Sequence, residues 1–440
     1  MSPVVRSVSS DEVLPKAVDV VVIGGGIVGT ASAYFLAKRG FSVALLEKGH
    51  VACEQSSRSW GWCRQQNRDP REMPLSLISM RLWANLATDI GQDLGFRRTG
   101  LIYTTDNAAM LAYWEAWRPT AKEFGVETHM LSAAEAGRQI PQARRKWLGG
   151  LHSVADGKGE PAIAAPALAE GARALGATIH QNCAAWGLDV TNGRVTGVHT
   201  EKGYIRADAV LCAAGAWASG FMRRHGVIFP QASVRQTVVR SKPTVNVGEV
   251  LYCPDVAMTR RLDGSYTMAI SGRATLEITP QGIRFAREFL PQFIKRFKSV
   301  KLRLGSSFFG GPESLGALFG NDATIFERNR VLDPAPNRRL VQVIMDNVRG
   351  TFPELAGLEI DHAWGAYVDC TPDAIPVISG IDTLGGLYLA AGCSGHGFGL
   401  GPGVGYLAAE LITNETPSVD PTPFRFARLI DGSMINVGPL

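Results

Sequence analysis

Hydrophobic residues in the first fifty positions follow the pattern of a buried strand, a helix and a second strand. Residues 18–23 are apolar on both faces, which is typical of a parallel strand covered on both sides. Residues 27–39 predict a helix with basic residues in its last turn and Gly40 after it. Residues 41–46 are again apolar and end on Glu47. The sequence therefore predicts an α/β fold that begins with a strand–helix–strand unit.

The rest of the chain predicts two further kinds of organisation. Helical patterns alternate with short strands up to residue 217; the helices are expected over 73–95, 107–124 and 163–175, and the strands over 99–105, 176–180, 195–206 (a hairpin) and 207–213. From about 230 to 355 the pattern predicts a separate antiparallel sheet with a hairpin turn at Asp263-Gly264 and a helix near 280–298. A strand over 388–391, a glycine-rich loop over 392–405 and a helix over 406–412 are expected near the end.

The turn after the first strand has the pattern Gly24-x-Gly26-x-x-Gly29. Gly24 allows a tight turn, Gly26 lets a pyrophosphate approach the backbone, and Gly29 lets the helix pack close to the strand. The N-terminus of the helix favours phosphate charge. Glu47 follows at the distance where an acid accepts hydrogen bonds from ribose hydroxyls. An acid at this position argues against NADP, and it leaves FAD or NAD.

The glycine-rich segment 392–405 predicts a second contact between backbone and ligand. So many glycines cost conformational entropy, so we expect the backbone to lie against a ligand there, with a helix N-terminus directed at it. NAD has no need of such a segment, whereas the isoalloxazine ring of FAD does. The segment therefore favours FAD.

Two other segments predict contacts with a flat ligand. Residues 53–66 combine small, polar and aromatic residues in a pattern that fits no regular amphipathic element. Arg58 and Arg64 are the informative charges in this loop, and the alternative for each is a solvated surface arginine. The buried strand that starts near 207 stops on the small residues Ala214 and Gly215, where backbone would approach a dinucleotide.

Composition narrows the class of protein. Hydrophobic residues make up 45% of the 440 positions and charged residues 19%, as in an ordinary soluble protein with one large domain or two. The net charge is +5, and the sequence contains no run of basic residues. The charge pattern therefore does not indicate nucleic-acid binding. We expect no secretory signal, no membrane span and no metal site, and the seven scattered cysteines are expected to be reduced thiols in a cytoplasmic protein.

Taken together, these motifs resemble the FAD-dependent D-amino acid oxidase superfamily, which contains glycine oxidase, sarcosine oxidase and related amine dehydrogenases. The resemblance covers nearly the whole chain. It rests on the glycine turn with Glu47, on residues 56–58, 156–161, 207–217, 352–355, 364–365 and 371–376, and on the segment Ser394-Gly-His-Gly-Phe398.

The resemblance implies a Rossmann-like FAD-binding domain and a substrate domain with a large antiparallel sheet. The FAD-binding domain is expected over 15–72, 145–232 and 360–440, and the substrate domain over 73–144 and 233–359. The resemblance also implies hydride transfer from the carbon beside an amine to flavin N5, giving an imine. The expected cofactor-binding residues are Gly24, Gly26, Ile27, Val28, Gly29, Glu47, Lys48, Ser56, Ser57, Arg58, Gly61, Trp62, Ala185, Ala214, Gly215, Trp217, Gly395, Gly397, Phe398 and Gly399.

Three positions depart from the best-known members of the superfamily. The arginine that often binds the substrate carboxylate corresponds to Val368, and the lysine of sarcosine oxidase corresponds to Gly399. The cysteine that carries covalent flavin corresponds to Ala366, and Cys370 is out of register with it. We therefore expect FAD to be bound without a covalent link.

The sequence predicts an FAD-dependent oxidase or dehydrogenase of a small amino acid or N-substituted amino acid. Arg64 is the leading candidate for the substrate carboxylate, with Arg260 or Arg261 as alternatives. His396 is expected beside the flavin, unless it only hydrogen-bonds the glycine-rich segment. The acceptor of electrons would be O2 or an electron-transfer partner. The alternatives are a dehydrogenase of a carboxylate-free amine and a subunit that uses FAD as a structural element in a complex.

Overall fold

The computed structural model describes residues 3–319 and 325–438, and its strands form two large sheets. The eight-stranded sheet has the central order β19-β20-β11-β1-β2-β8, and β10 and β9 continue from β11. Its strands are β1 (Ala17–Ile23), β2 (Val43–Leu46), β8 (Thr178–His180), β9 (Ala185–Thr191), β10 (Arg194–Thr200), β11 (Gly203–Cys212), β19 (Val377–Gly380) and β20 (Leu387–Ala391). Strands β1, β2, β8, β11 and β20 run parallel. The predicted strand–helix–strand unit is confirmed.

The ten-stranded sheet has the order β17-β16-β12-β15-β14-β13-β4-β6-β5, with β18 paired to β12. Its strands are β4 (Leu101–Thr105), β5 (Thr128–Ser132), β6 (Gly149–Ser153), β12 (Ala232–Ser241), β13 (Val250–Cys253), β14 (Val256–Arg260), β15 (Tyr266–Ala269), β16 (Ala274–Ile278), β17 (Val300–Leu304) and β18 (Ile360–Cys370). The hairpin at Asp263-Gly264 is confirmed, because β14 and β15 pair antiparallel across it and Gly264 has a positive φ of 82°. The sheet is mainly antiparallel, as expected, and it also contains the parallel pairs β13–β4 and β16–β17.

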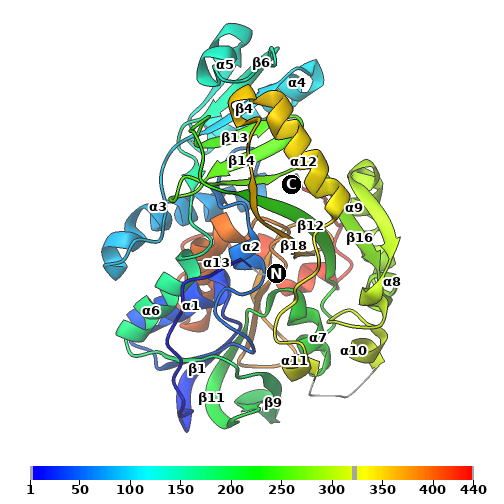
Figure 1. Ribbon diagram of the computed structural model, residues 1–440. Helices are drawn as coiled ribbons and strands as arrows, with labels where there is room; N and C mark the ends of the chain where they lie inside the picture. Colours follow the sequence, from blue (N-terminus) through cyan, green and yellow to red (C-terminus); the bar gives the residue numbers. More distant parts are fainter. Residues whose placement is uncertain (1–2, 320–324, 439–440) are drawn as a thin grey trace.

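Helices pack on these sheets and between them (Figure 1). They are α1 (Ile27–Lys38), α2 (Gln55–Arg58), α3 (Met73–Ile90), α4 (Ala108–Glu123), α5 (Ala133–Gln139), α6 (Ala164–Ala174), α7 (Ala218–Arg223), α8 (Pro280–Arg284), α9 (Ala286–Arg296), α10 (Leu315–Phe319), α11 (Ile325–Arg328), α12 (Arg338–Thr351) and α13 (Gly397–Ile412). In Figure 1 the strands β1, β9 and β11 lie at the bottom, β4, β13 and β14 lie toward the top, and α13 lies between them. Within residues 3–319 and 325–438, no helix combines the length and apolar composition needed to cross a bilayer.

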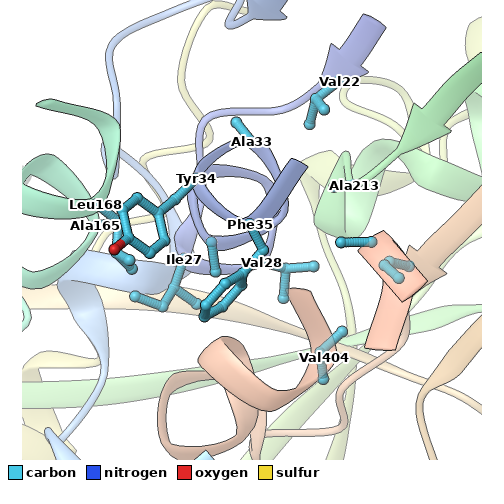
Figure 2. Close-up of a cluster of buried hydrophobic side chains, with 14 of the residues drawn as sticks. Val22, Ile27, Val28, Ala33, Tyr34, Phe35, Ala165, Leu168, Ala213 and Val404 are labelled. Carbon is cyan, nitrogen blue, oxygen red and sulfur yellow. The ribbon is translucent and has the colours of Figure 1, made fainter. Parts of the chain in front are cut away.

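Helix α1 is buried nearly all round. Figure 2 shows Tyr34 directed toward Ala165 and Leu168 of α6, whereas Phe35 lies on the side of Val404 in α13. Small residues let these helices approach closely, and α1 therefore holds the glycine turn in a fixed place against the sheet.

The glycine-rich segment corrects the sequence interpretation. We expected a loop over 392–405, but α13 begins at Gly397 and contains most of these glycines. A Cβ on Gly401 would lie 2.7 Å from Ile27, and one on Gly405 would lie 2.6 Å from Ala31. Packing against α1 explains Gly401 and Gly405, Gly403 packs against α3, and only residues 392–396 remain as a loop.

The expected division into two domains remains a proposal. Most of the segments expected in the FAD-binding domain contribute to the eight-stranded sheet. However, β6 and β18, which fall within the expected cofactor segments 145–232 and 360–440, pair in the ten-stranded sheet.

Candidate functional site

A cavity of about 710 Å³ is lined by residues of both sheets and of the loops that connect them. The glycine turn, Glu47 and Trp217 line one part, which we call the dinucleotide end. Arg64, Arg68 and Tyr103 line another part, which we call the substrate end.

The glycine turn has the geometry that a pyrophosphate site requires. A Cβ on Gly24, where φ is +111°, would lie 2.4 Å from the carbonyl oxygen of Ala213. A Cβ on Gly29 would lie 1.9 Å from the carbonyl oxygen of Gly24, so both positions exclude any side chain. A Cβ on Gly26 would meet only Ser56 Oγ within 4 Å, at 3.2 Å. Because Gly26 also lines the cavity at the N-cap of α1, its open side is available to a phosphate group.

Glu47 lies at the end of β2, where the ribose-binding acid is expected. Its carboxylate accepts hydrogen bonds from the backbone N–H groups of Gly25 and Gly49, both at 2.7 Å. Burial raises the pKa of this carboxyl group, while Lys48 acts in the opposite direction. The two backbone bonds fix the carboxylate and leave it acceptor capacity for ribose hydroxyls.

A distant segment, residues 325–333, which we call the strap, lies over the dinucleotide end. The Nζ of Lys48 donates to the carbonyl oxygens of Asn329 and Arg330, and it lies 4.1 Å from the ring centre of Trp217. Arg330 donates to the carbonyl oxygen of Lys48 at 2.9 Å and forms an ion pair with Glu201.

Two further contacts hold the end of the strap. The N–H of Leu332 donates to Glu54 Oε1 at 3.0 Å, and Asp333 lies 3.2 Å from the guanidinium of Arg58. Arg58 is only 2% exposed, so it is not the solvated surface arginine that was the alternative. Local sequence patterns do not predict the strap, because its contacts with Lys48 and Glu54 join residues about 280 positions apart.

Most of the expected cofactor residues line the cavity. They are Gly24, Gly26, Ile27, Val28, Glu47, Lys48, Ser56, Arg58, Gly61, Trp62, Ala185, Ala214, Gly215, Trp217, Gly395, Gly397 and Phe398. The remaining three support the cavity without lining it: Gly29 packs on Gly24, Ser57 hydrogen-bonds the carbonyl oxygen of Glu54, and the carbonyl oxygen of Gly399 accepts from Ser79 and Trp83. The open side of Gly26 at the start of α1 and the fixed carboxylate of Glu47 therefore fit FAD, while the N–H of Ile27 is taken by Ser56 Oγ.

Aromatic side chains form the wall of the substrate end. The rings of Trp62, Tyr103 and Tyr252 lie within 5.5 to 6.4 Å of one another, and Trp114 packs edge-on against both tyrosines. Trp114 is buried in the core and also lines the cavity.

Two arginines lie among these rings. Arg64 is half-buried, and its guanidinium donates to the carbonyl oxygen of Gln66. Arg68 is 2% exposed, and its Nη1 has no hydrogen-bond partner among the residues that the structure describes. Burial and the neighbouring charge of Arg64 lower the pKa of Arg68 to about 10. The sequence interpretation missed Arg68, which lies four positions after Arg64 in a polar run that it followed only to residue 66.

His396 closes the substrate end beside α13. Its Nδ1 lies 3.1 Å from Oε2 of Glu72, and both side chains are buried. Burial, reinforced by the charge of Arg68, lowers the pKa of His396 to about 4, so the imidazole is neutral at physiological pH. Glu72, at the start of α3, was not singled out from the sequence.

The other expected arginines lie away from the cavity. Arg260 does not line it; its guanidinium lies 3.4 Å from the carbonyl oxygen of Thr244 and over the ring of Tyr266. Arg261 is buried but forms an ion pair with Glu160 at 3.3 Å. Arg260 is the last residue of β14 and Arg261 follows it, and neither side chain lines the cavity.

The comparison with known proteins decides the family. A model of the FAD dependent oxidoreductase family matches residues 19–411. The chain belongs to this family. FAD is therefore the cofactor, and the predicted resemblance and fold class are confirmed. The choice of FAD over NAD was right even though half of the glycine-rich segment has another role.

Relatives and solved structures agree with this assignment. The chain is 28% identical to mitochondrial sarcosine dehydrogenase of Homo sapiens over 92% of its length, but it spans only 41% of that relative. It is 24% identical to sarcosine oxidase subunit beta of Rhizobium meliloti, covering 95% of this chain and 90% of that one. The L-amino acid deaminase from Proteus myxofaciens, solved with anthranilate, superposes with a TM-score of 0.90 at 28% identity and covers 97% of this chain and 98% of that one.

Proposed function

We propose that this family member oxidises the CH–NH bond of an amino acid or N-substituted amino acid to an imine, with FAD as the hydride acceptor. The observation that carries this proposal is the arginine pair Arg64 and Arg68 in the wall of the cavity. A buried guanidinium with an unpaired N–H is costly, and a carboxylate satisfies it with two charge-assisted hydrogen bonds. The names of the relatives concern sarcosine and L-amino acids, which are carboxylated amines.

Several groups of this chain would act on such a substrate. Arg64 and Arg68 would bind its carboxylate. They would replace the arginine that many members of the superfamily have at the position of Val368. The hydroxyl of Tyr103 is buried without a partner among the described residues, and it would donate to the same carboxylate. The aromatic wall excludes water from the reacting carbon. Bound FAD supplies the hydride acceptor.

The test is anaerobic reduction of the flavin by a panel of amino acids, N-methyl amino acids and simple amines. Arg68→Met and Arg64→Met should each raise the KM for carboxylated substrates by about 30-fold or more, because truncation of one member of a buried charge pair costs at least about 2 kcal/mol. Arg260→Met is the matched control, since this arginine lies outside the cavity, and its KM should not change. A wild-type flavin that no amine bleaches would contradict the proposal.

A carboxylate-free amine is the second candidate, and the aromatic wall favours it. The rings of Trp62, Tyr103 and Tyr252 could hold a cationic amine through cation–π contacts. In that case Arg68→Met would leave the KM unchanged or lower it. The rate at which the reduced flavin reoxidises in air distinguishes the two electron acceptors: fast reoxidation indicates O2, and slow reoxidation indicates a protein partner. A protein partner would fit the name of the related sarcosine oxidase subunit beta.

A further inference from the structure

Behind the wall of the substrate end lies a buried carboxylate that binds neither an arginine nor a backbone amide in any described contact. Glu72 is 0% exposed, and its carboxylate lies 3.1 to 3.3 Å from Nδ1 of His396. The two residues are 324 positions apart and stand at the starts of α3 and α13. Burying a carboxylate costs desolvation free energy. A role for Glu72 in holding His396 would explain why the carboxylate is buried there.

The contact determines which nitrogen of His396 carries the proton. A carboxylate can only accept a hydrogen bond, so Nδ1 must donate. A neutral imidazole has a single N–H, and Nε2 is therefore left with its lone pair. Nε2 is buried and has no partner among residues 3–319 and 325–438, although His396 lines the cavity. A buried acceptor without a donor predicts that a ligand supplies one.

We propose that Glu72 is a positioning residue that holds His396 in the tautomer with an unprotonated Nε2, and that this Nε2 accepts a hydrogen bond from the amine N–H of the substrate. The inference rests on the proposed function. It gives the substrate two points of attachment, since Arg64 and Arg68 bind its carboxylate and His396 orients its amine. The positive arginines act on His396 as neighbours, and they disfavour an imidazolium there. The histidine thus serves as an acceptor and needs no proton transfer.

The test is Glu72→Gln, because an amide of the same size can donate to Nδ1 and leave Nε2 protonated. We expect the Kd of the holoenzyme for an amine-bearing substrate, measured under anaerobic conditions, to rise about tenfold, the effect of one lost hydrogen bond in a buried site. The Kd for the matching carboxylic acid without the amine should stay within about twofold. Glu410→Gln is the matched control, because Glu410 is a buried carboxylate of α13 that binds Ser418.

A second measurement keeps the inference testable if Glu72→Gln does not fold. Nitrogen NMR of wild-type protein with labelled histidine should show His396, assigned from His396→Asn, with Nε2 unprotonated and Nδ1 protonated. The opposite tautomer would overturn the inference, and so would equal weakening of both ligands, which indicates only a structural link between α3 and α13. A wild-type flavin that no amine reduces would refute the proposed function. The nitrogen NMR measurement would still show which nitrogen of His396 is protonated, so the two failures can be distinguished.

Discussion

The two ends of the cavity are built in different ways. The dinucleotide end is built around one continuous stretch, from β1 through α1 to Glu47, in which Gly29 packs on Gly24 and Glu47 accepts from Gly25. Ala213, directly after the neighbouring strand β11, lies against Gly24. At the substrate end, Arg68 follows a loop, Glu72 ends a 3₁₀ turn, Tyr103 lies on β4 and His396 caps α13. Local turn geometry thus fixes the cofactor site, whereas long-range topology assembles the substrate site.

The largest expected effect separates two glycines of the same turn. Gly26→Val should abolish FAD binding and leave the apoprotein folded, because a Cβ there meets only Ser56 Oγ within 4 Å and the added methyl groups extend into the space of the pyrophosphate. Gly29→Val should prevent folding, because its Cβ would overlap the carbonyl oxygen of Gly24. Flavin content and circular dichroism measure both. A Gly26→Val protein with full flavin would show that the pyrophosphate lies elsewhere.

Glu47→Ala is a second variant at the same end. The loss of the carboxylate removes the acceptor for the ribose hydroxyls and the bonds that fix Gly25 and Gly49. We expect greatly weakened FAD binding, measured as flavin retained after gel filtration. Retention equal to wild type would contradict the assigned role of Glu47.

Whether FAD is bound covalently is a further test of the residues that line the cavity. Ala366 lines it at the position that, by the resemblance, corresponds to the flavin-linked cysteine of sarcosine oxidase, and burial raises the pKa of the Cys370 thiol, also in the lining, to about 12. A protonated thiol is a poor nucleophile, so we expect FAD to be held without a covalent bond. Acid precipitation should release all flavin into the supernatant. Flavin left on the denatured chain would contradict this, and Cys370→Ser would then identify the thiol.

The glycine-rich segment shows where sequence reasoning fails in physical terms. Glycine frees a backbone to approach a ligand, but it equally frees a helix to approach another helix, and the local sequence does not distinguish the two. Gly395 lies in the cavity wall, whereas Gly401 and Gly405 touch α1. Which residues a glycine contacts depends on how distant parts of the chain pack together. The contact between Glu72 and His396 depends on the same long-range packing. The fold class, the glycine turn and Glu47 were predictable because each depends on a few adjacent residues.

Gly405→Ala measures this helix packing directly. Its Cβ would lie 2.6 Å from Ala31 and 2.7 Å from the backbone nitrogen of Ser32, and overpacking of this kind costs about 1–3 kcal/mol. Chemical unfolding of the apoprotein should show the loss. Gly350→Ala in α12 is the control, because its Cβ would meet nothing within 4 Å, and it should be neutral or slightly stabilising. Equal stability of the two variants would mean that α13 can shift away from α1.

The smallest expected effect concerns the strap, a long-range element of the dinucleotide end. Arg330 joins it to Glu201 in a partly exposed ion pair, which contributes at most ~1 kcal/mol. Arg330→Gln should therefore speed FAD dissociation by about fivefold, followed by flavin fluorescence on dilution, and high salt should reduce the difference between the variants. Arg39→Gln, which breaks the pair with Glu415 away from the cavity, is the control. If Arg330→Gln releases FAD at the wild-type rate, the backbone contacts of Lys48 suffice to hold the strap, and Lys48→Met should then show the effect instead.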